Sequence, residues 1–243
     1  MISVCMAAYN GEKYIRKQID SILCQLSDDD ELIISDNGST DRTREIVESY
    51  NDKRIKYLEY ITDEKNKFYR VTLNFNNSLI HARGDYIFLA DQDDIWSKDK
   101  VSIMIKDLLE HPCVISNYVL IDFQDKVISD SKFNSDPLKH RMRSFIKMPF
   151  LGCTMAFTGE FLRKYCLPFP DKLILHDLWI GLIAYLKRDM YFEEDCLHFY
   201  RMHGDNVTTA SSGRSRNSLY FKISYRINLY KDVISRIIKT KRL

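Results

Sequence analysis

The sequence predicts an α/β protein with a mostly parallel central sheet flanked by helices on both faces. Three observations predict this class. Short apolar runs of strand length alternate with segments whose apolar residues recur at helical spacing. Several of those runs end in polar, turn-forming residues. The chain has 243 residues, of which 45% are hydrophobic and 29% charged, so it can bury a full core.

The first half of the chain supplies the clearest alternation. Strands are expected at four short apolar runs: Ile2–Ala8, Glu31–Ser35, Ile55–Ile61 and Tyr86–Ala90. Amphipathic spacing predicts helices between and after them, at residues 15–26, 42–50, 73–82 and 98–108. Asn10 and Ser97 stand where they can cap the first and the last of these helices.

The second half is less regular. Strands are expected at Val114–Asp122, Thr154–Phe157 and Met190–Tyr200, and helices at Gly159–Tyr165 and Asp177–Tyr185. Residues 123–148 are polar and mixed, and they predict no regular element. No change in composition separates two domains, so we expect one domain over residues 1–210.

A basic tail follows this domain. The formal net charge of the chain is +2, yet residues 214–243 hold nine basic residues and one acid, so the tail carries +8 and residues 1–213 carry −6. Five apolar residues spaced four apart predict an amphipathic helix within residues 211–243: Phe221, Tyr225, Leu229, Val233 and Ile237. Such a helix either contacts an anionic membrane or packs on the domain with its basic side in solvent. No nucleic-acid-binding motif accompanies it, so nucleic acid is not an expected partner.

Other patterns concern location. No basic leader precedes the first apolar run, and no stretch approaches the ~20 apolar residues of a membrane span. Six cysteines occur without a C-x-x-C pair, which predicts free thiols. We therefore expect a cytoplasmic protein, peripheral at the inner face of the cytoplasmic membrane if the tail binds lipid.

Polar residues follow three of the expected strands at the point where each strand ends: Asn10, Asp36 and 91–94. In open α/β sheets, ligands bind outside the carboxyl ends of the strands. The Asp91-x-Asp93 pair places two carboxylates on one side of an extended segment, and such pairs bind Mg²⁺ or Mn²⁺ together with a diphosphate. A metal-bound diphosphate is a good leaving group. The alternative is an acidic, solvated turn before the next helix.

Three segments resemble the motifs of the family-2 glycosyltransferases, which are inverting, nucleotide-sugar-dependent enzymes of the GT-A fold: 4–11, 34–43 and 84–96. The resemblance runs from residue 2 to about residue 210. Two further segments, His176–Trp179 and Tyr200–Asn206, are similar to the bacterial surface-polysaccharide branch, which includes rhamnosyltransferases. The resemblance implies a nucleotide-sugar-binding half at residues 1–112, an acceptor and catalytic-base half at residues 113–210, and the helical tail at residues 211–243.

The resemblance also implies roles on the donor side. Ala8, Tyr9 and Asn10 match the first-strand motif that contacts the base and ribose, and Asp36 matches the acid that hydrogen-bonds the nucleotide. Asp91 and Gln92 match the nucleotide-sugar side of the DXD motif, and Asp93 matches its metal ligand, with Asp91 facing the ribose and the metal's waters. Arg201 matches a contact to the diphosphate, and His203 a contact to the diphosphate or the metal. For Asp36 the alternative is a turn acid that bonds its own loop, and for Tyr9 it is core packing.

On the acceptor side, Asp177 matches the catalytic base. Sugar hydroxyls are weak nucleophiles, so an inverting transfer needs a positioned carboxylate to take the proton as attack proceeds. The alternative for Asp177 is a helix N-cap. The remaining acceptor-side candidates are Gly152, Thr154, His176 and Trp179. Trp179 either stacks on a sugar or is simply buried.

One departure from the family pattern stands at Leu73, where many relatives carry Arg or Lys before the Asn74-Phe75 pair. Arg70 or Lys67 can take over such a basic contact to the nucleotide. A dehydrogenase-type nucleotide fold is not supported, because the first strand lacks G-x-G-x-x-G. A glycosidase could use paired acids, yet the nucleotide-side motifs would then have no purpose.

These observations predict an inverting glycosyltransferase. The donor is a dTDP- or UDP-sugar, dTDP-rhamnose among them, and the acceptor is a hydroxyl of a glycan, lipid-linked, in O-antigen or capsule synthesis. The expected cofactor is Mg²⁺ or Mn²⁺. The alternative is a catalytically silent, sugar-nucleotide-binding scaffold subunit of a polysaccharide assembly complex.

Overall fold

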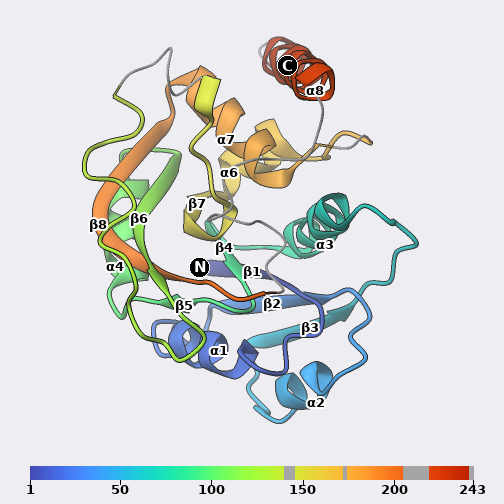
Figure 1. The fold of residues 1–243 in the computed structure, drawn as a ribbon, viewed down its shortest axis with the longest axis vertical. Coiled ribbons are helices and arrows are strands. Elements are labelled where there is room, and N and C mark those ends of the chain that lie inside the picture. The colour runs from blue at the N-terminus through green and yellow to red at the C-terminus, as the bar shows by residue number, and fades with distance from the viewer. Residues whose placement is uncertain (140–145, 172–173, 205–218, 241–243) are drawn as a thin grey trace.

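A single curled sheet runs through the molecule, with helices packed on both of its faces (Figure 1). The computed structural model describes residues 1–139, 146–171, 174–204 and 219–240. Its strands are β1 (Ile2–Ala8), β2 (Glu31–Asp36), β3 (Ile55–Glu59), β4 (Tyr86–Asp91), β5 (Ile95–Trp96), β6 (Cys113–Ile121), β7 (Met155–Thr158) and β8 (Met190–Arg201). Their order in the sheet is β3-β2-β1-β4-β7-β6-β8-β5.

The first four strands in that order are parallel, and their carboxyl ends are level with one another. Ala8 pairs with Asp36, and Ala7 pairs with Asp91, so the polar residues that follow these strands meet at one edge. β7 is antiparallel to both β4 and β6, while β8 is again parallel to β6. The α/β class with a mostly parallel sheet is confirmed.

Helices cover the sheet on both sides. They are α1 (Ile15–Leu23), α2 (Thr43–Glu48), α3 (Lys67–His81), α4 (Lys100–Leu108), α6 (Gly159–Phe161), α7 (His176–Lys187) and α8 (Leu219–Thr240), with a 3₁₀ turn η1 (Gly152–Thr154) and a π turn η2 (Leu162–Cys166). Alternate residues of each strand enter opposite cores, as the period of two requires. One core contains residues of α1 and α4, and the other contains residues of α3, α7 and α8.

The curl of the sheet depends on the two-residue strand β5. It follows β4 closely in the sequence, yet it pairs with the distant strand β8 and forms that edge of the sheet, with Ile95 opposite Phe199 and Trp96 opposite His198. The sheet must therefore bend until the end of β8 lies beside the acidic segment between β4 and β5. This bend brings the residues at and after the end of β8, near position 200, to the carboxyl edge of the parallel strands.

Two expected helix caps are wrong. Asn10 has a left-handed φ of 50°, and its Oδ1 accepts the backbone N–H of Thr40 instead of one in α1. Ser97 does not cap α4, whose N-cap residue is Asp99. The third helix also begins earlier than expected, at Lys67, because the Asn66 side chain accepts two of its first backbone N–H groups.

The tail helix α8 packs on the domain through the stripe that the sequence singled out. Leu229 and Val233 are fully buried in the core beside α7, and Tyr225 and Ile237 pack against the same core. Residues 211–218 and 241–243, and the side chain of Phe221, lie outside the described residues. For this stripe, packing on the domain is the correct interpretation. The described helices include none with the length and apolar character needed to cross a membrane, and all six cysteines are free thiols as expected.

Leu229→Ala is expected to lower the free energy of unfolding by about 2–4 kcal/mol, because it leaves a cavity between α8 and the domain. Ile227→Ala, on the outer side of the same helix, is expected to change it by less than about 0.5 kcal/mol. Urea unfolding followed by circular dichroism measures both. Equal effects of the two substitutions would contradict the packing of α8.

Candidate active site

The acidic segment between β4 and β5 is tied to the end of β1 by Gln92. Its side-chain Oε1 accepts the backbone N–H of Tyr9 at 2.9 Å, and its Nε2 donates to the carbonyl of Tyr9 at 2.9 Å. A Cβ at Gly11 would lie 2.2 Å from that Oε1, so a larger residue there would displace the Gln92 amide. Gln92 is expected to contact the nucleotide-sugar. In the structure both polar atoms of its amide bond the backbone of Tyr9 and so join two loops of the site.

His203 and Asp93 lie together, as their shared assignment to the diphosphate and metal region requires. His203 Nε2 is 2.8 Å from Asp93 Oδ2, although 110 residues separate them in the sequence. Both side chains are partly exposed, which leaves them accessible from the carboxyl edge. The curl of the sheet at β8 produces this contact.

Arg201 has a different position from the one expected. Its side chain is fully buried, with Nε donating to the Asp93 carbonyl at 2.6 Å and the guanidinium paired with Asp125 at 2.5 Å. It also donates to the carbonyl of Asp122 at 2.9 Å and lies over the ring of Tyr14. The expectation that Arg201 offers its charge to a diphosphate is corrected: in this structure its guanidinium holds the backbone of the acidic segment.

Like charges are concentrated in this segment. Burial raises the pKa of Asp91 well above its ordinary value, and the nearby carboxylates of Asp94, Asp93 and Asp177 raise it further. A divalent cation relieves such repulsion, and carboxylate oxygens with an imidazole nitrogen are ligands that Mn²⁺ and Mg²⁺ accept. The structure brings Asp93 and His203 into contact, but among the described residues it does not gather the ligand atoms of Asp91, Asp93 and His203 within 4.8 Å of one another, so their joint binding of a divalent cation stays a prediction.

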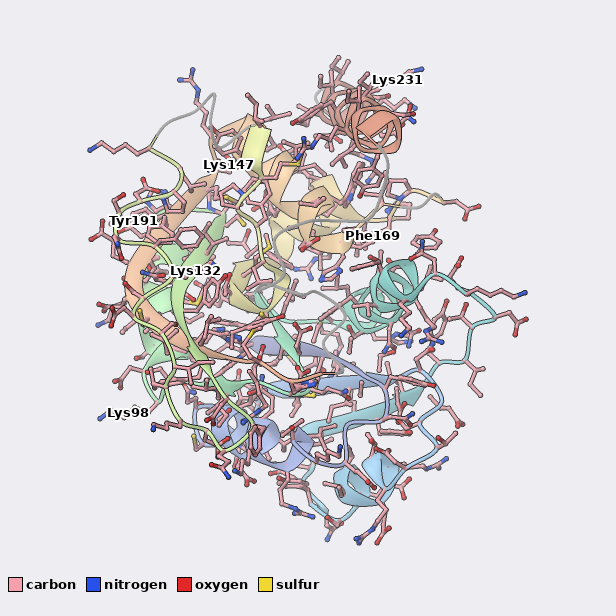
Figure 2. All side chains as sticks on the ribbon, viewed as in Figure 1. Lys98, Lys132, Lys147, Phe169, Tyr191 and Lys231 are labelled. Carbon is pink, nitrogen blue, oxygen red and sulfur yellow. The ribbon has the colours of Figure 1, made fainter. Side chains whose placement is uncertain are left out.

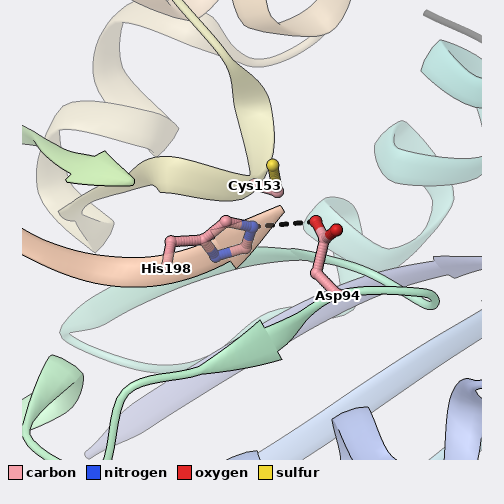
Figure 3. Close-up of side chains that lie close together, drawn as sticks. All are labelled: Asp94, Cys153 and His198. Atoms are coloured by element: carbon pink, nitrogen blue, oxygen red, sulfur yellow. Dashed lines mark hydrogen bonds and ion pairs between the residues drawn. The ribbon is translucent and has the colours of Figure 1, made fainter. Parts of the chain in front are cut away.

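A buried group of three side chains, Asp94, Cys153 and His198, includes one residue of the acidic segment (Figure 3). The ligand atoms of Asp94, Cys153 and His198 all lie within 4.8 Å of one another. His198 Nε2 is 2.8 Å from Asp94 Oδ2, and Asp94 Oδ1 accepts the backbone N–H of Arg201 at 2.8 Å. The group therefore connects the acidic segment to the end of β8.

The ammonium of Lys100 makes this buried group unsuitable for a metal. Lys100 Nζ lies 3.2 Å from His198 Nδ1 and donates to the carbonyl of Cys153 at 2.9 Å. Since the ammonium only donates, Nδ1 accepts and Nε2 carries the proton given to Asp94. A cation would have to displace the charge of Lys100 and that proton. We interpret the group as a structural network that fixes the acidic segment; sequence reasoning missed it, because Asp94 and His198 are 104 residues apart.

On the donor side, Tyr9 is 42% exposed, so the core-packing alternative for it is wrong. The guanidinium carbon of Arg70 lies 4.9 Å from the centroid of its ring. α3 thus places Arg70, one turn before Leu73, beside the first-strand motif. Behind it, Asn74 Nδ2 donates to the carbonyl of Ala8 at 3.0 Å and fixes the end of β1.

Asp36 is fully buried at the end of β2. Its Oδ1 accepts the backbone N–H and the hydroxyl of Ser39 at 2.9 and 2.7 Å, and its Oδ2 accepts the hydroxyl of Tyr57 at 2.8 Å. These contacts agree with the alternative in which Asp36 bonds its own loop. The same loop bonds Asn10 through Ser39 and Thr40. A direct contact from Asp36 to a nucleotide stays a prediction.

The acceptor side is built on the start of α7. His176 stacks on Phe75 with ring centroids 4.2 Å apart, and burial lowers its pKa to about 3, so its imidazole is neutral. A Cβ at Gly152 would lie 2.5 Å from His176 Nε2 and 3.6 Å from the Asp177 Cβ, so the glycine permits close packing of η1 on α7. Thr154 donates its hydroxyl to the carbonyl of Leu151 and is buried.

Asp177 lies in the first turn of α7, and no side-chain cap bond forms at the N-cap residue, Leu175. Burial raises the pKa of Asp177 to about 6, and its charge in turn raises the pKa of Asp91. Asp177 is therefore close enough to Asp91 for their charges to interact, and its role as the base stays a prediction. Trp179 is corrected to a core residue, because it is 1% exposed and its Nε1 donates to the carbonyl of Cys166.

Residues 3–165, more than half of the chain, match the family described as Glycosyl transferase family 2. The chain belongs to the family-2 glycosyltransferases. Among curated relatives of this family, TuaG of Bacillus subtilis, named for teichuronic acid biosynthesis, is 30% identical over 86% of this chain and 82% of its own length. WfgD of Escherichia coli, named as a UDP-Glc:α-D-GlcNAc-diphosphoundecaprenol β-1,3-glucosyltransferase, is 31% identical over 75% and 70%. The dTDP-rhamnosyl transferase RfbG of Shigella flexneri is 29% identical over 91% and 77%.

Solved structures of other glycosyltransferases share the fold. S. aureus TarS 1–349 in complex with UDP-GlcNAc superposes with a TM-score of 0.66 at 21% identity, over 88% of this glycosyltransferase and 61% of the TarS chain. Glucosyl-3-phosphoglycerate synthase of Mycobacterium tuberculosis, in complex with Mn²⁺ and UDP, gives 0.57 at 20% identity, over 99% and 79%. These likenesses confirm the expected GT-A fold.

His198→Ala is expected to lower the free energy of unfolding by about 3 kcal/mol, because Asp94 and Lys100 then remain buried without their shared partner. His81→Ala, on the exposed side of α3, is the matched control and is expected to cost less than about 0.5 kcal/mol. Chemical denaturation of both variants tests this. A His198→Ala protein as stable as the control would show that the network contributes no stability.

Asp177→Asn is expected to increase stability. The folded chain holds a proton on Asp177 up to about pH 6, above the ordinary pKa of 3.8, so it loses stability relative to the unfolded chain as the pH rises from about 4 to about 6. The asparagine variant avoids this loss, a gain of up to about 3 kcal/mol at pH 8 that is smaller at pH 5. Urea unfolding at both pH values measures the gain, and a variant less stable than the parent at pH 8 would refute the raised pKa of Asp177.

Proposed function

We propose that this protein transfers a sugar, with inversion, from a nucleotide-diphosphate donor to a hydroxyl of a glycan acceptor in bacterial surface-polysaccharide synthesis. The observation that carries the proposal is the contact of His203 with Asp93 in the acidic segment, with the Asp177 carboxylate close enough to raise the pKa of Asp91. Family membership and the relatives named for teichuronic acid biosynthesis and dTDP-rhamnosyl transfer support it.

Asp177 is proposed as the catalytic base. The acceptor hydroxyl attacks C1 of the donor sugar from the face opposite the diphosphate; the new C1–O bond forms as the C1–O bond to the phosphate breaks. The hydroxyl proton passes to the Asp177 carboxylate. A pKa of about 6 leaves this carboxylate ionised at neutral pH and more basic than an ordinary aspartate, which favours proton transfer.

Asp91, Asp93 and His203 are proposed to hold one divalent cation, Mg²⁺ or Mn²⁺. When bound, the cation neutralises charge that develops on the leaving diphosphate. Asp94, His198 and Lys100 do not touch the donor in this proposal; they hold the acidic segment in place. Arg201 acts in the same way through the carbonyl of Asp93.

The donor half is proposed at residues 1–112 and the acceptor half at residues 113–210. The exposed ring of Tyr9, with Arg70 over one side, offers a surface on which a nucleotide base can stack. The names of RfbG and WfgD support a dTDP- or UDP-sugar as donor, and the name of WfgD supports an acceptor linked to a lipid diphosphate. A location at the inner face of the cytoplasmic membrane follows from such an acceptor.

A thermal-shift panel of UDP-, dTDP- and GDP-sugars, each with Mn²⁺, Mg²⁺ or EDTA, tests donor and metal together. One nucleotide class is expected to raise the melting temperature only with a divalent cation, because a ligand that binds the folded state stabilises it. Asp93→Asn is expected to abolish the metal-dependent part. A full shift in EDTA, or an unchanged shift in the variant, would contradict the proposed metal site.

Turnover separates an enzyme from a silent scaffold. Asp177→Asn is expected to keep the thermal shift with the preferred donor and to lose at least about 100-fold in transfer or donor hydrolysis, because the base is gone. Donor binding with no measurable turnover in the unmodified protein, with acceptor extracts supplied, would identify a sugar-nucleotide-binding subunit instead.

A further inference from the structure

The outward face of α8 carries an apolar stripe that the sequence reading did not single out. Ile223, Ile227, Ile234 and Ile238 are each between 48% and 59% exposed. They are spaced four, seven and four residues apart, so they lie on one side of the helix. α8 lies at the periphery of the molecule beside α7 (Figure 1).

The opposite side of α8 fixes the helix to the domain, so the outward stripe cannot turn inward. Leu229 and Val233 fill the core, and Arg236 donates to the carbonyls of Leu167 at 3.0 Å and Pro168 at 2.6 Å. The Arg236 guanidinium also lies over the ring of Trp179. The four isoleucines therefore stay on the surface and do not join the core.

Positive charge borders the stripe. Arg226, Lys231 and Lys239 are exposed, and Figure 2 shows Lys231 on the outer side of α8. The helix sequence from Leu219 to Thr240 holds five basic residues and one acid. Exposed apolar side chains flanked by cations are typical of a helix that lies in the interface of an anionic bilayer. The centre of a protein–protein interface is instead depleted of lysine.

We propose that the outward face of α8, formed by the four isoleucines and bordered by Arg226, Lys231 and Lys239, binds the surface of an anionic lipid bilayer. The isoleucines enter the region between headgroups and acyl chains, while the cations contact lipid phosphates. Since no described helix can cross a membrane, α8 lies on the bilayer and does not span it.

This face is connected to the acceptor side of the site. The hydroxyl of Tyr225 on α8 accepts the backbone N–H of Leu175 at 3.1 Å, two residues before Asp177. Binding through α8 would thus hold the start of α7 near the bilayer, where a lipid-linked acceptor resides. Only this consequence rests on the proposed function; lipid binding itself does not.

Co-sedimentation with vesicles tests the proposal on the full chain. The protein is expected to sediment with phosphatidylcholine vesicles that contain 30% phosphatidylglycerol, and at least about 10-fold less with phosphatidylcholine alone. Ile227→Glu/Ile234→Glu is expected to weaken binding at least about 10-fold, and Lys231→Gln/Lys239→Gln to a similar extent at low salt. Ile80→Glu/Ile128→Glu, exposed isoleucines elsewhere, is the matched control and is expected to bind like the parent protein.

Three results would overturn the proposal. The first is no sedimentation with anionic vesicles, and the second is equal sedimentation of the α8 variants and the control. The third is a dimer, seen by light scattering, that Ile227→Glu/Ile234→Glu converts to monomer, which would make this face a contact between two copies of the chain. The donor-dependent thermal shift of each variant is measured in parallel. This shift reports folding and donor binding, whereas sedimentation reports lipid binding. Failure of the proposed function would remove the donor-dependent shift, and failure of the membrane proposal would remove only the sedimentation.

Discussion

The pairing of β5 with β8 is the contact on which the site depends. It bends the sheet until the end of β8 lies against the acidic segment, and it thereby places His203 beside Asp93. Buried groups then hold the arrangement: Asp94 accepts from His198 and from the backbone of Arg201. A buried charge without partners is costly, so this network favours one position of the acidic segment over others.

The same packing sets the electrostatics of the site. The charge of Asp177 at the start of α7 interacts with Asp91 in the acidic segment, and burial strengthens such an interaction relative to water. Burial and proximity together raise the pKa of Asp91, and burial raises that of Asp177. The crowding of carboxylates around Asp91 suits a divalent cation, and the raised pKa of Asp177 suits a base. One structural cause thus supports both halves of the proposed transfer reaction.

The helix α8 connects the acceptor side of the site to the surface of the molecule. Its inner side packs beside α7 and contacts the residue just before His176, while its outer side is apolar and bordered by cations. A helix with two apolar sides is unusual on a protein surface unless each side has something to cover it. The inner side has the domain, and the outer side is the one we assign to a bilayer.

The sequence by itself determined the strands, the parallel sheet and the meeting of Asp36 and Asp91 at one edge, because these follow from local apolar periodicity and from the direction of parallel strands. Motif resemblance added the candidates Asp93, His203 and Asp177. Only the tertiary structure decided that Arg201 and Trp179 are buried and that Gln92 joins two loops, since their partners are distant in the sequence. It also decided which apolar side of α8 meets the core, because periodicity defines the sides of a helix and packing selects between them.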